Sequence, residues 1–221
     1  MLIIFDLDDT LIDTSGSITP TMRRLALEAM QKAGLSVGEK EKILLDQLDA
    51  ESESGEASIK KFLTILGADP AFAAVGEKVW YGDLPEGVRV EPMPGAAALL
   101  KALSKKNELA IVSIGNPDLQ RLKIEKAGIN SAVFSKIVIV TREDKKPSYQ
   151  KVMQDLGASP GKTVVCGDRI GRDLRPAKEL GCVTVHLLWG RGFHSQGEPQ
   201  DVDFTIRSLQ EIEGIVEQYY E

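Results

Sequence analysis

The sequence predicts an α/β fold built on a parallel sheet, and three observations support this prediction. Short apolar runs alternate with segments of helical periodicity over most of the chain. Four of the five candidate strands are continuous β-branched or apolar runs, which is typical of strands covered by helices on both faces. A long segment with only helical patterns separates the first strand from the others, so the sheet is built from two pieces of chain.

The first piece contains the run Leu2 to Phe5, which is followed at once by acidic residues. The helical segment then begins near residue 20, where Thr19 is the expected N-cap and Gly34 the expected stop. Further helices are expected at 39–48, 58–66 and 71–80. The polar stretch 50–57 between two of them is either an exposed turn or a loop that contacts substrate.

The second piece returns to alternating strands and helices. Expected strands are 109–112, 137–140, 163–166 and 183–187, and expected helices are 94–103, 117–127, 147–156, 173–180 and 208–219. We therefore expect a discontinuous core, residues 1–14 and 91–221, and a helical domain, residues 15–90. Ligands bind at the carboxyl ends of strands in such sheets, so a domain inserted after the first strand is placed to cover the site.

Composition excludes several classes of function. With 27 basic and 33 acidic residues the net charge is −6, which disfavours binding to nucleic acid or to anionic membranes but allows a small anionic substrate. No apolar window approaches the ~18 residues of a membrane span, and no signal peptide is evident, so we expect a cytoplasmic protein. Cys166 and Cys182 lie in apolar runs and are expected to be buried, reduced thiols.

Polar residues follow the first four expected strands. They are Asp6, Asp8 and Asp9, then Ser113, Gly115 and Asn116, then Lys145 and Lys146, then Asp168 and Asp173. All of them fall at one edge of a parallel sheet, so they can converge. Several carboxylates gathered there require a cation, and oxygen ligands suit Mg²⁺. A lysine and a hydroxyl donate hydrogen bonds to phosphate, so the pattern predicts phosphoryl transfer.

These residues form four motifs, which resemble those of the haloacid dehalogenase superfamily of phosphohydrolases. The motifs are Asp6-Leu7-Asp8-Asp9-Thr10, Ser113 at the end of a strand, Lys146 before Pro147, and Gly167-Asp168 with Asp173 five residues after Asp168. They occur in the family's order, each after an expected strand. The resemblance implies a Rossmann-like five-stranded sheet of order 5-4-1-2-3 with helices on both faces. It also implies that the helical insert is a C1-type cap.

The resemblance also implies a role for each residue. Asp6 is similar to the nucleophile that forms an aspartyl-phosphate, and Asp8 to the general acid and base. Ser113 and Lys146 are expected to hold the phosphoryl group. The implied Mg²⁺ ligands are Asp6, the backbone carbonyl of Asp8, Asp168 and Asp173. Asp8 is expected to have the higher pKa of the first pair, because Mg²⁺ holds Asp6 ionised.

Some residues near the motifs are expected to have other roles. Ile114 stands where related phosphatases often have asparagine, and Asn116 is not expected to replace it. Asp9 is expected to be a solvated or helix-capping acid. Lys145 is expected to be a surface charge, because only one of two adjacent lysines can point into the site. His186 lies in an apolar run and is expected to be structural.

The predicted function is a Mg²⁺-dependent phosphatase that acts on a small phosphomonoester. Sugar phosphates, nucleoside monophosphates and phosphoglycolate all fit, and the protein is expected to be a monomer or dimer. Asp8 argues against a dehalogenase, since a halide leaves without a proton. Two alternatives stay open: phosphoryl transfer of the β-phosphoglucomutase type, and a catalytically weak binding protein of the same fold. A response-regulator receiver is disfavoured because no aspartate follows Ile139-Val140.

Overall fold

The computed structural model describes residues 1–141 and 144–218, and it divides into two compact units. The first unit contains Met1–Thr14 and Arg89–Glu221, and the second contains Ser15–Val88. The second piece of the first unit thus begins at Arg89 rather than at residue 91.

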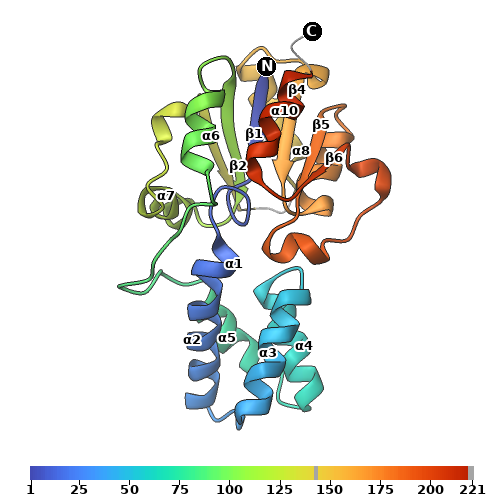
Figure 1. Cartoon of the computed structure of the whole chain (residues 1–221). Helices are drawn as coiled ribbons and strands as arrows, with labels where there is room; N and C mark the ends of the chain where they lie inside the picture. Colours follow the sequence, from blue (N-terminus) through green and yellow to red (C-terminus); the bar gives the residue numbers. More distant parts are fainter. Residues whose placement is uncertain (142–143, 219–221) are drawn as a thin grey trace. The chain divides into compact units, whose positions relative to one another are not determined.

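The first unit is built on a parallel sheet with strand order β3-β2-β1-β4-β5-β6. The strands are β1 (Leu2–Phe5), β2 (Glu108–Ile114), β3 (Lys136–Val140), β4 (Thr163–Gly167), β5 (Val183–Leu187) and β6 (Phe204–Ile206). Figure 1 shows β1 between β2 and β4. The expected parallel α/β fold and the order of the five expected strands are confirmed. The sixth strand was not expected, because three residues are too few to show a period.

Strand β1 is central and fully buried, as its unbroken apolar sequence predicts. Phe5, its last residue, lies beside Ile111 of β2 and Cys166 of β4. The loops that follow these strands therefore start close together at one edge of the sheet. On one face, Leu2 and Ile4 belong to a buried cluster formed with residues of β2, β4 and two helices. Cys166 and Cys182 are free and buried, as expected.

Helices flank the strands of the first unit. They are α6 (Ala96–Leu103), α7 (Pro117–Lys126), α8 (Lys146–Asp155), α9 (Arg175–Lys178) and α10 (Ile212–Glu217). The helix expected at 173–180 is shorter, because a π-helical turn, Ile170–Leu174, precedes α9. The helix expected at 208–219 begins as a 3₁₀ turn at Leu209–Glu211. Its expected end at Tyr219 lies outside the described residues.

The second unit contains α2 (Thr19–Lys32), α3 (Glu39–Glu51), α4 (Gly55–Leu66) and α5 (Phe72–Trp80), and the short α1 (Thr14–Ser17) lies at its start. Thr19 is the first residue of α2 rather than its N-cap. Of the stretch 50–57, only residues 52–54 lie between α3 and α4, where they form a short turn, and the other residues belong to the two helices. No helix within residues 1–141 and 144–218 is long and apolar enough to cross a membrane.

Candidate active site

The turn after β1 carries the two acids of the first motif. Asp6 directly follows the strand, and its backbone N–H donates to the carbonyl of Cys166 at 2.9 Å. The chain then reverses sharply: the N–H groups of Leu11 and Ile12 both donate to the carbonyl of Leu7. Because the strand ends before Asp6, the alternation of side chains along a strand does not separate Asp6 from Asp8.

Three carboxylates from two loops meet at this edge. Asp6, Asp168 and Asp173 are buried, and one oxygen from each lies within 4.8 Å of the others. Asp168 directly follows β4, while Asp173 belongs to the π-helical turn after it. Gly167 permits this arrangement, because a Cβ at its position would lie only 2.6 Å from Cβ of Asp173. The side chains of these three residues, all of them expected metal ligands, therefore lie close together.

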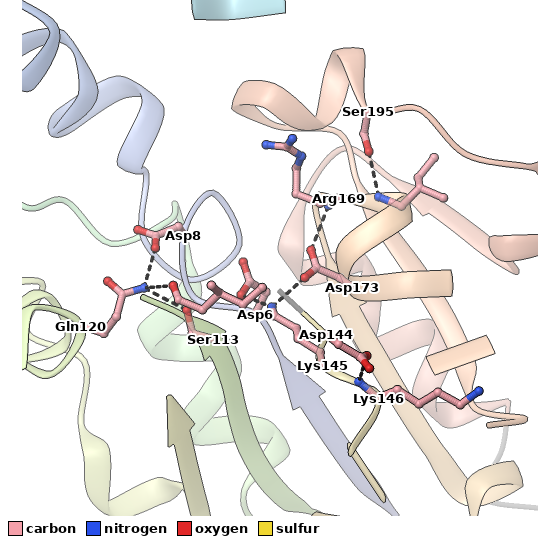
Figure 2. A network of polar contacts seen from close by, with 12 residues as sticks. Asp6, Asp8, Ser113, Gln120, Asp144, Lys145, Lys146, Arg169, Asp173 and Ser195 are labelled. Atoms are coloured by element: carbon pink, nitrogen blue, oxygen red, sulfur yellow. Dashed lines mark hydrogen bonds and ion pairs between the residues drawn. The ribbon is translucent and has the colours of Figure 1, made fainter. Parts of the chain in front are cut away.

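Lys145 is the lysine that lies among these acids, and the expectation that Lys146 points into the site is wrong. The Nζ of Lys145 lies 2.5 Å from Asp6 Oδ1 and 2.6 Å from Asp173 Oδ1 (Figure 2). Lys145 is 1% exposed, whereas Lys146 pairs with Glu179 at 2.7 Å on the surface.

The start of α8 explains which lysine points inward. The helix begins at Lys146, whose backbone N–H donates to Asp144 Oδ1 at 2.9 Å. Lys145 therefore occupies the N-cap position of α8, and its side chain enters the acidic cluster. Lys146 lies on the first turn of the helix, and its side chain extends away from the cluster in Figure 2.

Burial dominates the acid–base properties of the cluster. It raises the pKa of Asp6 to about 7, against the attraction of Lys145, and the charges of Asp173 and Asp8 add to the increase. Burial likewise raises the pKa of Asp168 well above its usual value, with further increases from Asp173 and Asp9. Burial lowers the pKa of Lys145, but the neighbouring carboxylates outweigh it and keep the ammonium charged.

The donor set fits a hard divalent cation. The cluster contains three buried carboxylates and one buried ammonium, which pairs with two of them, so it carries excess negative charge when all three acids are ionised. Carboxylate oxygens are the ligands that Mg²⁺ prefers. Asp6, Asp168 and Asp173 are the residues whose side chains would hold it.

The pKa of Asp6 predicts how stability depends on pH when divalent cations are absent. The folded value is about 7 and the reference value 3.8, so between them the folded state binds a proton that the unfolded state does not. The free energy of unfolding contributed by Asp6 is therefore lost as pH rises from about 4 to about 7. Mg²⁺ should raise the melting temperature more at about pH 8 than at about pH 5, because ionised carboxylates bind it.

Thermal unfolding of the wild type and of Asp6→Asn, each with EDTA and with Mg²⁺, measures this dependence. The asparagine variant should lack the Asp6 contribution, so its stability relative to wild type should improve as pH rises. Parallel pH curves for the two proteins would contradict the assignment.

Asp8 and Ser113 lie beside the cluster, and three residues that the sequence analysis does not predict contact Asp8. Gln120 Nε2 donates to Asp8 Oδ2 at 2.7 Å and to Ser113 Oγ at 2.9 Å (Figure 2). Lys123 Nζ lies 2.8 Å from Asp8 Oδ1, and the Thr14 hydroxyl donates to the same oxygen at 2.5 Å. The available signal was two long polar side chains three residues apart on one face of an expected helix.

Without a cation, the pKa of Asp6 lies above that of Asp8, and the opposite order, expected with Mg²⁺ bound, stays a prediction. Burial raises the pKa of Asp8, but Lys123 and the hydrogen bonds from Gln120 and Thr14 outweigh it and lower the value overall. The pKa of about 7 for Asp6 applies to the site without a cation, where only Lys145 offsets the charge of the carboxylates. A bound cation would hold Asp6 ionised and so lower its pKa.

The other residues near the motifs have structural partners. Asn116 does not enter the site: its side chain accepts hydrogen bonds from the first turn of α7. Asp9, expected to be solvated or capping, is 6% exposed, and its φ of 55° places it in the left-handed region at the sharp turn. His186 is buried on β5, with Nε2 2.9 Å from the backbone oxygen of Asp168, so it supports the loop that carries this acid.

The family model described as haloacid dehalogenase-like hydrolase matches residues 1–181. A glyceraldehyde 3-phosphate phosphatase of Methanocaldococcus jannaschii is 31% identical, over 97% of this chain and 96% of that protein. A phosphoglycolate phosphatase of Aquifex aeolicus is 27% identical, over 93% and 91% of the two chains.

Solved structures agree on the fold. The magnesium-bound putative hydrolase YfnB of Bacillus subtilis aligns with a TM-score of 0.68 at 19% identity, over 97% of each chain. The expected superfamily and the expected enzyme class, a phosphoric monoester hydrolase, are confirmed by the family model and the curated relatives. The four motifs, the sheet that gathers them and the family match over residues 1–181 together place this chain in the haloacid dehalogenase-like hydrolase family.

Proposed function

We propose that this protein is a Mg²⁺-dependent phosphatase that hydrolyses a small phosphomonoester through an aspartyl-phosphate on Asp6. The observation that carries the proposal is the buried cluster of Asp6, Asp168 and Asp173 with Lys145 between two of its acids. This cluster combines a nucleophile, a set of oxygen ligands for a cation and an ammonium group within one small volume. Phosphoryl transfer requires these components, because its catalysis is mostly positioning and charge stabilisation.

In the first step, a carboxylate oxygen of Asp6 attacks phosphorus. The bond between phosphorus and the ester oxygen breaks, and that oxygen takes a proton from Asp8 as the alcohol leaves. Lys145 and the Ser113 hydroxyl donate hydrogen bonds to the phosphoryl oxygens. Mg²⁺, when bound by the carboxylates, supplies positive charge that offsets the charge on these oxygens.

In the second step, water attacks the phosphorus atom of the acyl-phosphate. Asp8, now a carboxylate, takes a proton from that water. The bond between phosphorus and the Asp6 oxygen breaks, which releases inorganic phosphate and restores the Asp6 carboxylate. Asp8 ends the cycle protonated, as it began. Because Lys123, Gln120 and Thr14 lower its pKa, Asp8 must take up this proton before the first step, and the negative charge of a bound phosphate ester favours that uptake.

For the substrate, we infer a short aliphatic phosphomonoester. The support is that the relatives which this chain matches over nearly its full length are named for glyceraldehyde 3-phosphate and phosphoglycolate. In both compounds the leaving group is an aliphatic alkoxide, which is a poor leaving group. Its departure requires a proton, which Asp8 would deliver. Glyceraldehyde 3-phosphate is the first candidate, because the relative named for it is the more similar of the two.

Release of inorganic phosphate from a panel of esters tests this proposal. The panel contains glyceraldehyde 3-phosphate, 2-phosphoglycolate, glucose 1-phosphate, a pyrimidine nucleoside monophosphate and p-nitrophenyl phosphate, each with Mg²⁺ and with EDTA. We expect release that falls by about 100-fold or more in EDTA, since loss of a catalytic metal removes several kcal/mol of transition-state stabilisation. The short aliphatic esters should rank first.

Two results would overturn the proposal. Equal release with Mg²⁺ and EDTA would remove the metal from the mechanism. No release from any ester by folded protein would favour transfer of the phosphoryl group to a sugar, to be tested by interconversion of glucose 1-phosphate, or a binding role without catalysis.

A further inference from the structure

Helix α7 presents two buried polar side chains to the active site. Gln120 and Lys123 are three residues apart, so they lie on the same face of the helix. They are 2% and 8% exposed. Lysine is almost never buried without a partner, so its position requires an explanation from its contacts. Both side chains reach the same group, the Asp8 carboxylate.

The amide of Gln120 joins two parts of the site. Its Nε2 donates to Asp8 Oδ2 at 2.7 Å, to Ser113 Oγ at 2.9 Å and to the carbonyl of Ile114 at 3.2 Å. Gly115 leaves room for this side chain: it has a φ of 149°, and a Cβ there would lie 3.2 Å from Gln120 Cδ. The amide therefore fixes the acid of one loop relative to the hydroxyl at the end of β2.

Lys123 completes the restraint from the other side of the carboxylate. Its Nζ lies 2.8 Å from Asp8 Oδ1, while Gln120 holds Oδ2. The Thr14 hydroxyl also donates to Oδ1, so this oxygen has two donors and Oδ2 has one. Donors on both oxygens restrain rotation of the carboxylate about its terminal bond. Asp8 is nevertheless accessible, because its side chain is 30% exposed whereas that of Lys123 is 10% exposed. The Asp8 carboxylate is thus hydrogen-bonded by buried side chains and still partly accessible to solvent.

Such a restraint matters for proton transfer. A general acid must lie within about 2.6–3.2 Å of the oxygen that it protonates. A misplacement of about 1 Å costs about 100-fold in rate. A carboxylate with hydrogen bonds at both oxygens is already oriented for proton transfer before the substrate binds.

We propose that Gln120 and Lys123 are positioning residues, which orient Asp8 for proton exchange with the leaving oxygen and then with water. This inference rests on the proposed function, because it assigns a task to the acid of that reaction. It goes beyond that function because the two residues lie outside the four motifs, and the reaction is proposed to depend on them as well.

The test compares two substrates that differ in their need for an acid. The variants are Gln120→Leu and Lys123→Met, which keep the size of the side chains and remove the donors. Lys126→Met is the matched control, since Lys126 lies one turn further along α7 and is exposed. For each protein, kcat/KM is measured with the aliphatic ester that ranks first in the panel and with p-nitrophenyl phosphate, whose leaving group departs without a proton.

A positioning role predicts a selective loss. For the aliphatic ester, kcat/KM should fall by about 100-fold in each variant, whereas for p-nitrophenyl phosphate it should fall by less than about threefold. Lys126→Met should match the wild type with both esters, and Lys123→Arg should recover most of the loss. In an Asp8→Asn background, adding Gln120→Leu should have little further effect, because the group that it positions is already gone.

A purely structural role predicts a different pattern. Equal losses with both esters, or full activity of Lys123→Met on the aliphatic ester, would overturn the inference. Melting temperatures identify any variant that does not fold, and Gln120→Asn and Lys123→Leu then serve in its place. Failure of the proposed function is recognised separately, because the wild type would release no phosphate or Asp6→Asn would remain active.

Discussion

Asp6→Asn is expected to lower kcat for phosphate release by about 10⁴-fold or more, because it removes the nucleophile. The amide has the same shape as the carboxylate but no anionic oxygen to attack phosphorus. The substitution also removes a buried negative charge from a cluster whose burial already raises the pKa of Asp6 to about 7. We therefore expect the metal-free variant to be at least as stable as the wild type at neutral pH, which separates loss of chemistry from loss of fold.

Acid quenching during turnover, followed by mass spectrometry of the intact chain, measures the intermediate directly. The wild type should gain the mass of one phosphoryl group, mapped by digestion to the peptide that contains Asp6. Asp118→Asn is the matched control, since Asp118 is an exposed acid at the start of α7. Phosphate release by Asp6→Asn within tenfold of the wild type would contradict the assignment of the nucleophile.

The fold and most of the acidic cluster could be predicted because each depends on local sequence. Strand β1 and the acids after it form one short run, in which an apolar stretch ends where the carboxylates begin. The same holds for β4 and Asp168. A parallel sheet places the carboxyl ends of its strands at one edge, so the order of the elements was enough to bring the acids together.

The choice between two adjacent lysines could not be predicted in this way. It depends on where α8 begins, and helix ends are set by individual hydrogen bonds such as that from Lys146 N to Asp144. A shift of one residue at the helix start exchanges the inward and outward side chains. Sequence pattern places such a boundary only to within a few residues.

Gln120 and Lys123 were missed for another reason. Their partner, Asp8, is more than 100 residues away in the chain, so no local pattern connects them. The sequence of their helix is also largely polar. From the sequence alone, a buried lysine on such a helix cannot be distinguished from a solvated one. Only the tertiary structure shows that this face of α7 turns toward the acid.

Lys145→Met and Lys146→Met are expected to have very different effects, although the residues are neighbours. Lys145 is the ammonium partner of two buried carboxylates, and Lys146 pairs with Glu179 on the surface. Removing one partner of a buried ion pair typically costs about 3–5 kcal/mol, whereas a surface pair contributes about 1 kcal/mol or less. Urea unfolding of both variants in EDTA at about pH 8 measures this contrast.

The stability loss in Lys145→Met should shrink as the pH falls. Without the ammonium, the Asp6 carboxylate is stabilised less as an anion, so its protonation as the pH falls through about 7 removes more of the uncompensated charge. The variant should thus come closer to the wild type at about pH 5 than at about pH 8. A deficit that does not change with pH would indicate lost packing around a buried side chain rather than lost charge.

Activity should separate the two lysines in the same direction. Lys145→Met removes a cationic donor to the phosphoryl group and should lower kcat by about 100-fold or more with Mg²⁺ present, whereas Lys146→Met should stay within about twofold of the wild type. The opposite result would show that the lysine immediately before Pro147 holds the phosphoryl group, as the sequence motif predicts. Measuring kcat under conditions where both variants are folded, as judged by their melting temperatures, separates this loss of chemistry from the loss of stability.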